Sequence, residues 1–407
     1  MLSLTHHHRR HVFAVGVMMA AIVVLAGAVM ILLIHPSAGR VAQPISPAQT
    51  AVPTATSAET KMLVMGDIYW GRYINDWSMA SPLKYAYPFQ SLGDFNRPNY
   101  DAWVANMECP VTNNPKVRSS VEDSTLTFDC SPDYLPEAGK WFSAVSLANN
   151  HTGNQGGAVG LDETRLHLAE NGMQNFGTYD PEDTSNLCDV LSIPTQVVLS
   201  DGSTKQGNLP IAWCGYHGVF ATPSAASVAT MQRYAERFTV VAMPHSGKEY
   251  QPGPDQIKTT LYRALIDNGA DVVIGNHAHW VQTSEAYKGK LIMYSLGNFI
   301  FDQQLAPEMT RSAVLSIQAS VMVLDGPSLD RQLALGELCK AYKDTCLERA
   351  EQQQLQKLPL QLHFSVQGSV DTGKVTRRAN DEQLAGIKQR LNWTTTIANL
   401  NGMSSGE

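Results

Sequence analysis

The sequence has no excess of basic residues. Its 407 residues include 30 Lys and Arg against 37 Asp and Glu, which gives a formal net charge of −7 at pH 7. Nucleic-acid-binding domains present basic surfaces. We therefore expect no nucleic-acid partner and no binding of a polyanion through bulk charge. The sequence also contains no internal repeat, so a repeat architecture is excluded.

Cysteine is scarce, and its spacing is not that of a thiolate metal site. The six cysteines are Cys109, Cys130, Cys188, Cys214, Cys339 and Cys346. An even number in an exported domain is typical of disulfides, although six cysteines permit many pairings. We expect Cys109–Cys130, which would close one loop, and Cys339–Cys346, which lie close together in a helical-looking run.

An uncharged apolar run extends from Val12 to Ile34 behind a short basic segment with Arg9 and Arg10. It exceeds the roughly 20 residues that a bilayer-spanning helix needs. It is also longer than the apolar region of a secretory signal, which has roughly 7–15 residues. The run therefore favours a single-pass signal anchor in the cell membrane over a removed signal peptide. The positive-inside rule leaves residues 1–11 in the cytoplasm and places the rest of the chain outside it.

The remaining chain divides into three predicted parts. Residues 35–61 are rich in Pro, Ala, Ser and Thr, which predicts a flexible linker. Residues 62–325 contain short apolar strands separated by helical and turn segments, which indicates an α/β domain. Residues 326–407 are predicted to be an extension packed on this core. The extension would hold helices over about 329–357 and 381–391, a hairpin near 371–373 and a frayed tail from Asn392.

Polar residues follow five predicted buried strands at the point where each strand ends. In chain order they are Asp67, Glu108, Asn150 with His151, His245, and His277 with His279. Open α/β sheets place their ligands at the carboxyl ends of strands. Carboxylate, amide and imidazole groups without thiolates suit manganese, iron, zinc or magnesium. Taken alone, His277 and His279 are also compatible with an exposed polar loop, but the five strand ends together predict a hydrolytic site with one or two divalent metals.

Six motifs carry a resemblance to a known family. In chain order they are GDIYWGR, NMECP, SLANNHT, PHSGKEY, GADVVIGNHAH and YSLGNFIFD. Over about residues 62–302 the chain resembles the CapA family of poly-γ-glutamate capsule biosynthesis proteins, within the calcineurin-like metallophosphatase superfamily. The resemblance implies a four-layer α-β-β-α sandwich with a two-metal site on the strand tips. It also identifies residues 62–325 as a CapA-like metallophosphatase domain.

The resemblance implies a role for each strand-end residue. The implied metal ligands are Asp67, Glu108, Asn150, His245, His277 and His279. Among them Glu108 would bridge two metals, Asp67 and His279 would serve one metal, and the other three ligands would serve the second. His151 is implied to be a general acid beside the leaving group. Arg72 is implied to clamp an anion, although the residues alone leave open a simple ion pair with a nearby acid.

The chain departs from the superfamily pattern at several positions. Tyr69 stands where metallophosphatases have the histidine of Asp-x-His, which leaves the Asp67/His279 site one ligand short. Glu108 replaces an aspartate, and Asn154 replaces an acidic residue that is frequent in the family. These departures bear on metal occupancy and on the identity of the substrate.

Other polar residues near the motifs receive weaker interpretations. His217 also follows a strand, but no matching motif supports it, so the sequence favours a structural role. Glu249 is interpreted either as a carboxylate that orients His245 or as a solvated loop residue. Asn298 and Asp302 are expected to shape the loop that closes the last motif.

The sequence and the resemblance together predict a membrane-anchored, extracytoplasmic protein of capsule or poly-γ-glutamate biosynthesis. It would act as a metal-dependent hydrolase of the phosphoesterase type on an anionic cell-surface polymer or its precursor. The alternative is a non-catalytic subunit that binds this polymer alongside membrane synthase subunits. The capsule role follows from the resemblance alone, because a fold does not determine a function.

Overall fold

The computed structural model describes residues 52–323 and 325–404. The predicted basic segment 1–11, the signal anchor 12–34 and the linker up to residue 51 lie outside the described residues. Within the part of the chain that is described, no helix has the length and hydropathy of a membrane span. Residues from Val52 onward form one compact unit.

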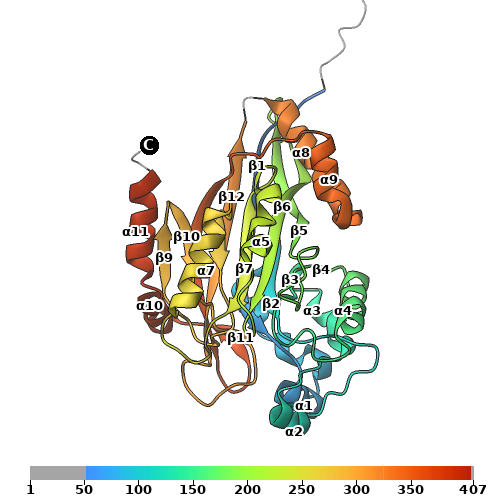
Figure 1. The fold of residues 1–407 in the computed structure, drawn as a ribbon, viewed down its shortest axis with the longest axis vertical. Helices are drawn as coiled ribbons and strands as arrows, with labels where there is room; N and C mark the ends of the chain where they lie inside the picture. The colour runs from blue at the N-terminus through green and yellow to red at the C-terminus, as the bar shows by residue number, and fades with distance from the viewer. Residues whose placement is uncertain (1–51, 324, 405–407) are drawn as a thin grey trace, which may run out of the picture. The chain divides into compact units, whose positions relative to one another are not determined.

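Strand β1 (Ala55–Ile68) lies at the centre of a large mixed sheet (Figure 1). Its first part pairs antiparallel with β5 (Cys188–Leu199) and β12 (Arg311–Met322). Its second part pairs parallel with β2 (Ala102–Met107), and its end pairs with β11 (Asn298–Ile300). The prediction of a linker over 55–61 is therefore wrong. The apolar signal there is weak because the only apolar residues buried in this part are small alanines. Pairing on both edges supplies the strand.

The sheet continues from β1 in several directions. One path runs β14 (Thr376–Arg378), β13 (Gln361–Asp371), β12, β1, β5, β6 (Thr204–Gly218), β7 (Val240–Ser246), β8 (Val272–Ile274), β10 (Lys290–Met293) and β9 (Ser284–Tyr287). A branch from β1 runs through β2 to β3 (Ala144–Ser146) and β4 (Gln174–Phe176). Along the branch, the neighbouring strands β1, β2, β3 and β4 are parallel. On the main path, the neighbouring strands β6, β7, β8 and β10 are parallel. Each parallel set therefore brings its carboxyl ends to one edge.

The central strands bury both faces, in different apolar clusters. Val104 of β2 belongs to a cluster that β1, β5 to β8, β10 and β12 also line. Its neighbours Trp103 and Ala105 belong to a second cluster with α1 (Arg72–Ala80), α3 (Leu135–Ala138) and α4 (Ala158–Glu170). A third cluster packs β6 to β8 against α5 (Ala225–Ala229), α6 (Met231–Ala235) and α7 (Gln256–Asp267). The fold is thus mixed α/β, with helices on both outer sides of the β structure.

The C-terminal residues extend this architecture. The predicted single helix over 329–357 is α8 (Gly326–Ala341) and α9 (Cys346–Gln352), separated by a 3-10 turn at Lys343–Thr345. Helix α10 (Asp381–Arg390) agrees with the prediction. The predicted frayed tail is instead helix α11 (Trp393–Ser404), whose three threonines and two asparagines weaken the helical signal. Burial of Trp393 in the central cluster stabilises it.

Three disulfides join all six cysteines. Cys109–Cys130 and Cys339–Cys346 confirm the two predicted bonds. The third bond, Cys188–Cys214, joins facing positions of β5 and β6. It could not be chosen from sequence spacing because it depends on the register of that strand pair.

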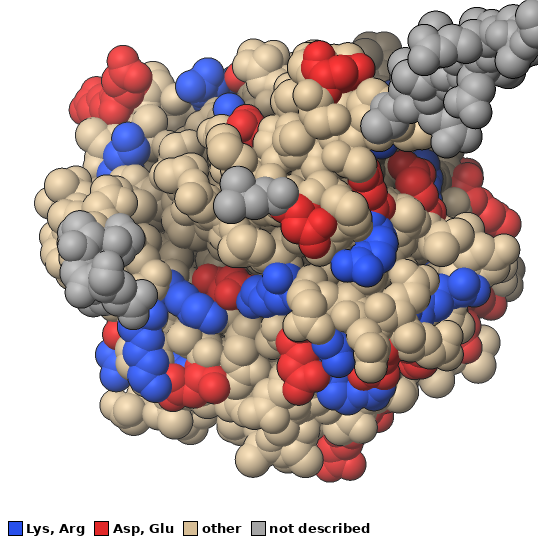
Figure 2. All heavy atoms as spheres, turned by 90° about the horizontal axis from the view of Figure 1, so that it is seen from above, with Lys and Arg blue, Asp and Glu red and all other residues tan. Residues whose placement is uncertain are grey.

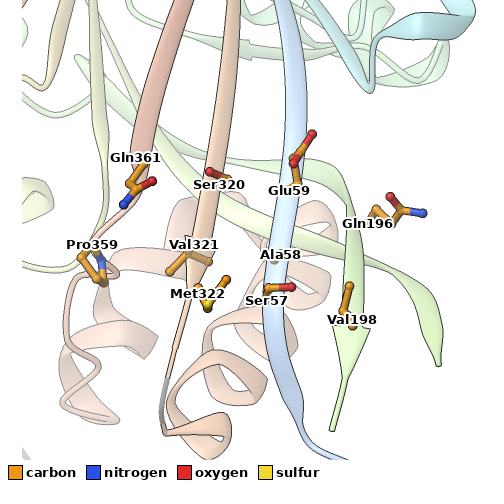
Figure 3. Close-up of a pocket in the computed structure, with 10 residues that line it drawn as sticks. All are labelled: Ser57, Ala58, Glu59, Gln196, Val198, Ser320, Val321, Met322, Pro359 and Gln361. Carbon is orange, nitrogen blue, oxygen red and sulfur yellow. The ribbon is translucent and has the colours of Figure 1, made fainter. Parts of the chain in front are cut away.

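Two surface features lie away from the polar strand ends. A hollow of about 520 Å³ crosses β1, β5 and β12, with Ser57, Gln196 and Met322 on its walls (Figure 3). None of the predicted ligands lines it. On the face that Figure 2 presents, acidic and basic side chains are interspersed, without a continuous basic track.

Candidate metal centre

The predicted ligands meet at the carboxyl ends of the parallel strands. They lie at the ends of β1, β2 and β7 and in the loops after β3 and β8, namely Asp67, Glu108, His245, Asn150, His277 and His279. Five of the six are buried, and Asn150 is half-buried. The structure thus brings together residues that are more than 200 positions apart in the chain.

Glu108 lies among these ligands, and neither of its carboxylate oxygens has a hydrogen-bond partner. Its Oε1 lies 3.4 Å from His245 Nε2, 3.8 Å from His279 Nε2 and 3.9 Å from His151 Nε2. Burial is the main effect that raises the pKa of Glu108 well above its usual range. A buried carboxylate without a donor is costly. A cation between this carboxylate and the surrounding imidazoles would satisfy it, so the residues present fit a metal.

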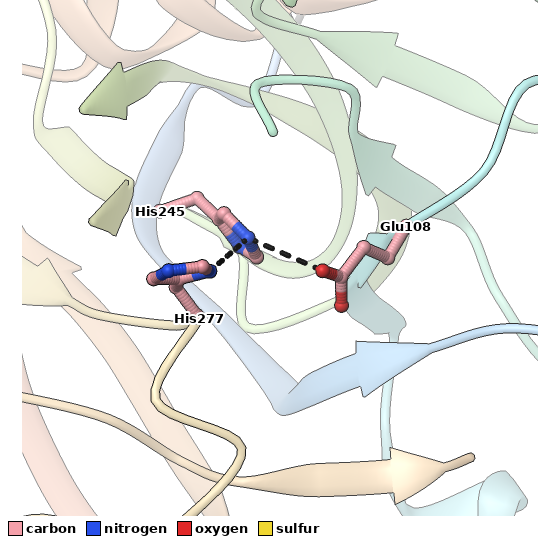
Figure 4. A group of neighbouring side chains, drawn as sticks. All are labelled: Glu108, His245 and His277. Carbon is pink, nitrogen blue, oxygen red and sulfur yellow. Dashed lines mark hydrogen bonds and ion pairs between the residues drawn. The ribbon is translucent and has the colours of Figure 1, made fainter. Parts of the chain in front are cut away.

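We call the first group of ligand atoms the histidine half: Glu108, Asn150, His245 and His277. His245 Nε2 lies 3.1 Å from His277 Nδ1 and 2.9 Å from Asn150 Oδ1. Figure 4 shows the two imidazoles and the Glu108 carboxylate turned toward one another. Burial lowers the pKa of both histidines well below the usual range, so each ring is neutral. Neutral imidazole is the form that binds metals.

We call the second group the aspartate half: Asp67, Glu108 and His279. His279 Nδ1 lies 2.7 Å from Asn298 Oδ1, which can only accept a hydrogen bond, so Nδ1 carries the proton. The lone pair on Nε2 then faces Glu108. Asn298 was expected only to shape a loop, but it orients a metal-ligand candidate, as residues behind a metal site commonly do. Burial raises the pKa of Asp67 to about 7 and lowers that of His279 to about 4.

Glu249 supplies a further carboxylate beside His279 of the aspartate half. The Tyr69 side chain turns away from the metal centre, because its hydroxyl donates to Glu122. Glu249 Oε1 lies 3.7 Å from His279 Nε2, and it also forms a possible metal-binding group with His277 and His279. The expected role beside His245 is therefore corrected, since Glu249 faces the other histidines. The acidic residue in the PHSGKEY motif was the sequence signal that could have indicated this carboxylate.

The loop that carries His277 and His279 has an unusual backbone. Both residues have positive φ, 82° and 53°, a region that non-glycine residues rarely adopt. Lys258 of α7 is fully buried below this loop, and its Nζ donates to the carbonyl oxygen of Asn276 at 3.2 Å. Burial lowers the pKa of Lys258 to about 7. The sequence did not indicate this lysine, because its burial depends on the packing of α7.

His151 adjoins the histidine half in a neutral form. Its Nδ1 lies 2.8 Å from Asn154 Oδ1, and its ring stacks on Phe128 with centroids 3.7 Å apart. The Asn154 oxygen also accepts from the Phe128 N–H, which fixes the amide orientation. His151 Nδ1 is therefore the donor, and Nε2 faces Glu108. Burial lowers the pKa of His151 to about 3, and an uncharged amide does less than a carboxylate to favour the protonated ring.

Arg72 lies beside the centre in an ion pair. Its Nε and Nη2 both donate to Asp302, and its guanidinium stacks over Phe128 with 4.6 Å between Cζ and the ring centroid. Only 5% of Arg72 is exposed. The ion pair that the sequence left open is therefore present, and Asp302 holds the arginine rather than only shaping a loop.

A comparison with protein families covers the segment that carries this site. Residues 61–303 match the family model described as the bacterial capsule synthesis protein PGA_cap. The chain belongs to the PGA_cap family. The matched range contains the six motifs and every predicted site residue. The resemblance to capsule and poly-γ-glutamate biosynthesis proteins is thereby confirmed.

Similar proteins in this family come from several bacteria. The capsule biosynthesis protein CapA of Bacillus anthracis is 27% identical over 259 residues, which are 60% of each chain. The PGA biosynthesis protein CapA of Bacillus subtilis strain 168 is 27% identical over 254 residues, 59% of this chain and 62% of that one. A probable polyglutamine synthesis accessory protein of Mycobacterium tuberculosis is 24% identical over 242 residues, 55% of this chain and 62% of that one. The matches thus span about 60% of these PGA_cap relatives.

One solved structure is matched at a low level. The crystal structure of TT1561 of Thermus thermophilus covers 63% of this chain and 93% of its own, with 11% identity and a TM-score of 0.31.

Proposed function

We propose that this PGA_cap family protein is a metal-dependent hydrolase of the phosphoesterase type that acts in capsule or poly-γ-glutamate biosynthesis. The observation that carries the proposal is Glu108, a buried carboxylate without a donor at the meeting point of several neutral imidazoles. Helices outside two β layers, with polar residues at the strand ends, support a four-layer metallophosphatase-like sandwich.

Two metal positions follow from the ligand groups. The histidine half would hold one divalent ion, and the aspartate half with Glu249 would hold the other. Divalent ions at these positions would polarise a phosphoryl oxygen and activate water. The oxygen and nitrogen ligand set suits manganese, iron, zinc or magnesium.

The chain's own residues complete the proposed chemistry. His151 Nε2 faces Glu108, so it is placed to exchange a proton with a leaving group beside the metals. Phe128 covers one face of the His151 ring and keeps water from it. Arg72, held by Asp302, adds a fixed positive charge that attracts an anionic substrate without a large rearrangement.

We also propose that residues 12–34 anchor the protein in the cell membrane with the enzymatic domain outside the cytoplasm. The three disulfides support this location, because disulfides persist in oxidising compartments. An anionic cell-surface polymer or its precursor would then be the substrate. Membrane synthase subunits would be the partners.

One observation favours the alternative of a non-catalytic polymer-binding subunit. Asn154 replaces an acidic residue next to His151, so the ring lacks the charge that would stabilise its protonated form. A site with ligands but a weak proton donor could bind an anionic polymer without cleaving it.

Metal content decides between the two functions. The full chain would be purified in detergent without chelators, analysed for metals and assayed on bis(p-nitrophenyl) phosphate. We expect about two equivalents of a divalent metal in the wild-type protein and a lower metal content in His277→Ala. The rate of hydrolysis should rise and fall with the metal content. His363→Ala, on an exposed position of β13, is the matched control. A protein that binds no metal after reconstitution would contradict the hydrolase and leave the polymer-binding subunit.

A further inference from the structure

His217, at the end of β6, carries a buried ring nitrogen that has no partner. Only 3% of the residue is exposed, and Nε2 is buried without a hydrogen bond. Nδ1 is bonded to the backbone carbonyl oxygen of Tyr179. A carbonyl oxygen only accepts, so Nδ1 carries the proton and Nε2 keeps a free lone pair. A buried acceptor without a donor is costly, so a ligand that brings a donor would remove this cost.

The strand register places the His217 side chain beside that of His245. In the parallel pair β6–β7, His217 is aligned with His245. Aligned residues on neighbouring strands project from the same face of a sheet, and His245 points into the centre.

His217 lies beside the metal positions without belonging to them. It joins none of the groups of three ligand atoms found within the described residues. Its alignment with His245 places it next to the histidine half.

The chemistry of Nε2 selects what can dock there. A neutral ring with a lone pair accepts hydrogen bonds and repels ionised phosphoryl or carboxylate oxygens, which are acceptors too. The group that docks must therefore present an N–H or an O–H. Phe220 adds an apolar wall, since its ring lies 5.4 Å from the His217 ring and 78% of the residue is exposed. A planar amide suits both features, because its N–H can reach the acceptor while its plane packs against the aromatic ring.

We propose that His217 and Phe220 form a substrate subsite next to the metal centre, in which His217 Nε2 accepts a hydrogen bond from an amide N–H of a γ-glutamyl chain. The identity of the chain rests on the proposed function, whereas the acceptor and its position rest on the structure. The subsite holds a part of the substrate that does not react. It is thus a determinant of specificity, separate from the ligands and from His151.

The test compares two probes that differ only in this donor. One is a γ-linked glutamate oligomer, and the other is the same oligomer methylated at every amide nitrogen. Both are titrated calorimetrically into the Mn²⁺-loaded full chain. We expect the wild-type protein to bind the N–H oligomer about five- to tenfold more tightly, the effect of one buried hydrogen bond. His217→Phe should lose this preference and keep its metal, while His363→Phe should retain both.

A second variant shows whether His217→Phe loses the preference because the acceptor is gone or because the protein misfolds. His217→Gln keeps an acceptor oxygen, so it should retain a preference of at least about twofold. The subsite is overturned if wild-type protein binds both oligomers equally, if it binds neither, or if the preference persists in His217→Phe. Failure of the proposed function looks different, since it would be a lack of metal or of bis(p-nitrophenyl) phosphate hydrolysis. Oligomer binding is measured without turnover, so the two failures are distinguishable.

Discussion

The two halves of the metal centre differ in how completely the chain supplies them. The histidine half has two neutral imidazoles, an amide and the shared Glu108 within short distances. The aspartate half has Asp67 and His279 in place, but its fourth candidate is Glu249, whose side chain is 40% exposed. Buried ligands are held in position by packing, whereas an exposed carboxylate must be ordered when the metal binds. We therefore expect the histidine half to bind its metal more tightly.

Glu108→Gln should have the largest effect, because it removes the charge that both halves share. We expect loss of both metals and a fall in hydrolysis of about a thousandfold or more. In the metal-free protein the same change removes a buried carboxyl group that has no hydrogen-bond partner, so the thermal midpoint should stay equal or rise. Elemental analysis and a melting curve in chelator measure the two effects. Metal retained at the wild-type level would refute the bridging role.

Glu249→Gln should separate the halves. We expect the affinity of the weaker metal to fall about 10- to 100-fold. The tighter metal should be weakened less, because Glu249 adjoins His279 and His277 but not His245. Calorimetric titration of the chelated protein resolves the two binding events. The neighbouring exposed residue supplies the control variant, Lys248→Gln. Equal weakening of both events would remove the distinction between the halves.

Lowering the pH should also weaken metal binding in the aspartate half more than in the histidine half, but by a smaller factor. Burial raises the pKa of metal-free Asp67 from 3.8 to about 7, so below this pH the metal must displace a proton from Asp67. Affinity of the aspartate half should therefore fall as the pH falls, by up to about tenfold per unit. A proton on Glu108 would weaken metal binding in both halves, because they share this carboxylate. Metal stoichiometry measured between pH 7.5 and 5.5 should show the weaker ion leaving first, and simultaneous loss would contradict this order. Titrations would use about half-unit pH steps.

The part of the site that lies along single segments was predictable from the sequence. Short apolar strands followed by Asp67, Glu108 and His245 have a local signature, and the fold places these residues as expected. The contact of Asn298 with His279 and that of His217 with Tyr179 were not predictable, because they depend on which ring nitrogen faces which neighbour across strands. Residues of β1 before Met62 escaped prediction for a related reason. Their strand conformation depends on pairing with β5 and β12, far along the chain.

Strand β1 has a mechanical consequence. It is 14 residues long, it begins next to the N-terminal end of the described chain, and Asp67 is its last residue but one. Antiparallel ladders to β5 and β12 flank its first part on both edges. A pull on the start of β1 along its axis would load these hydrogen bonds together, in shear. The ladders would have to break as a group before such tension displaced the metal-ligand candidate at the other end of the strand.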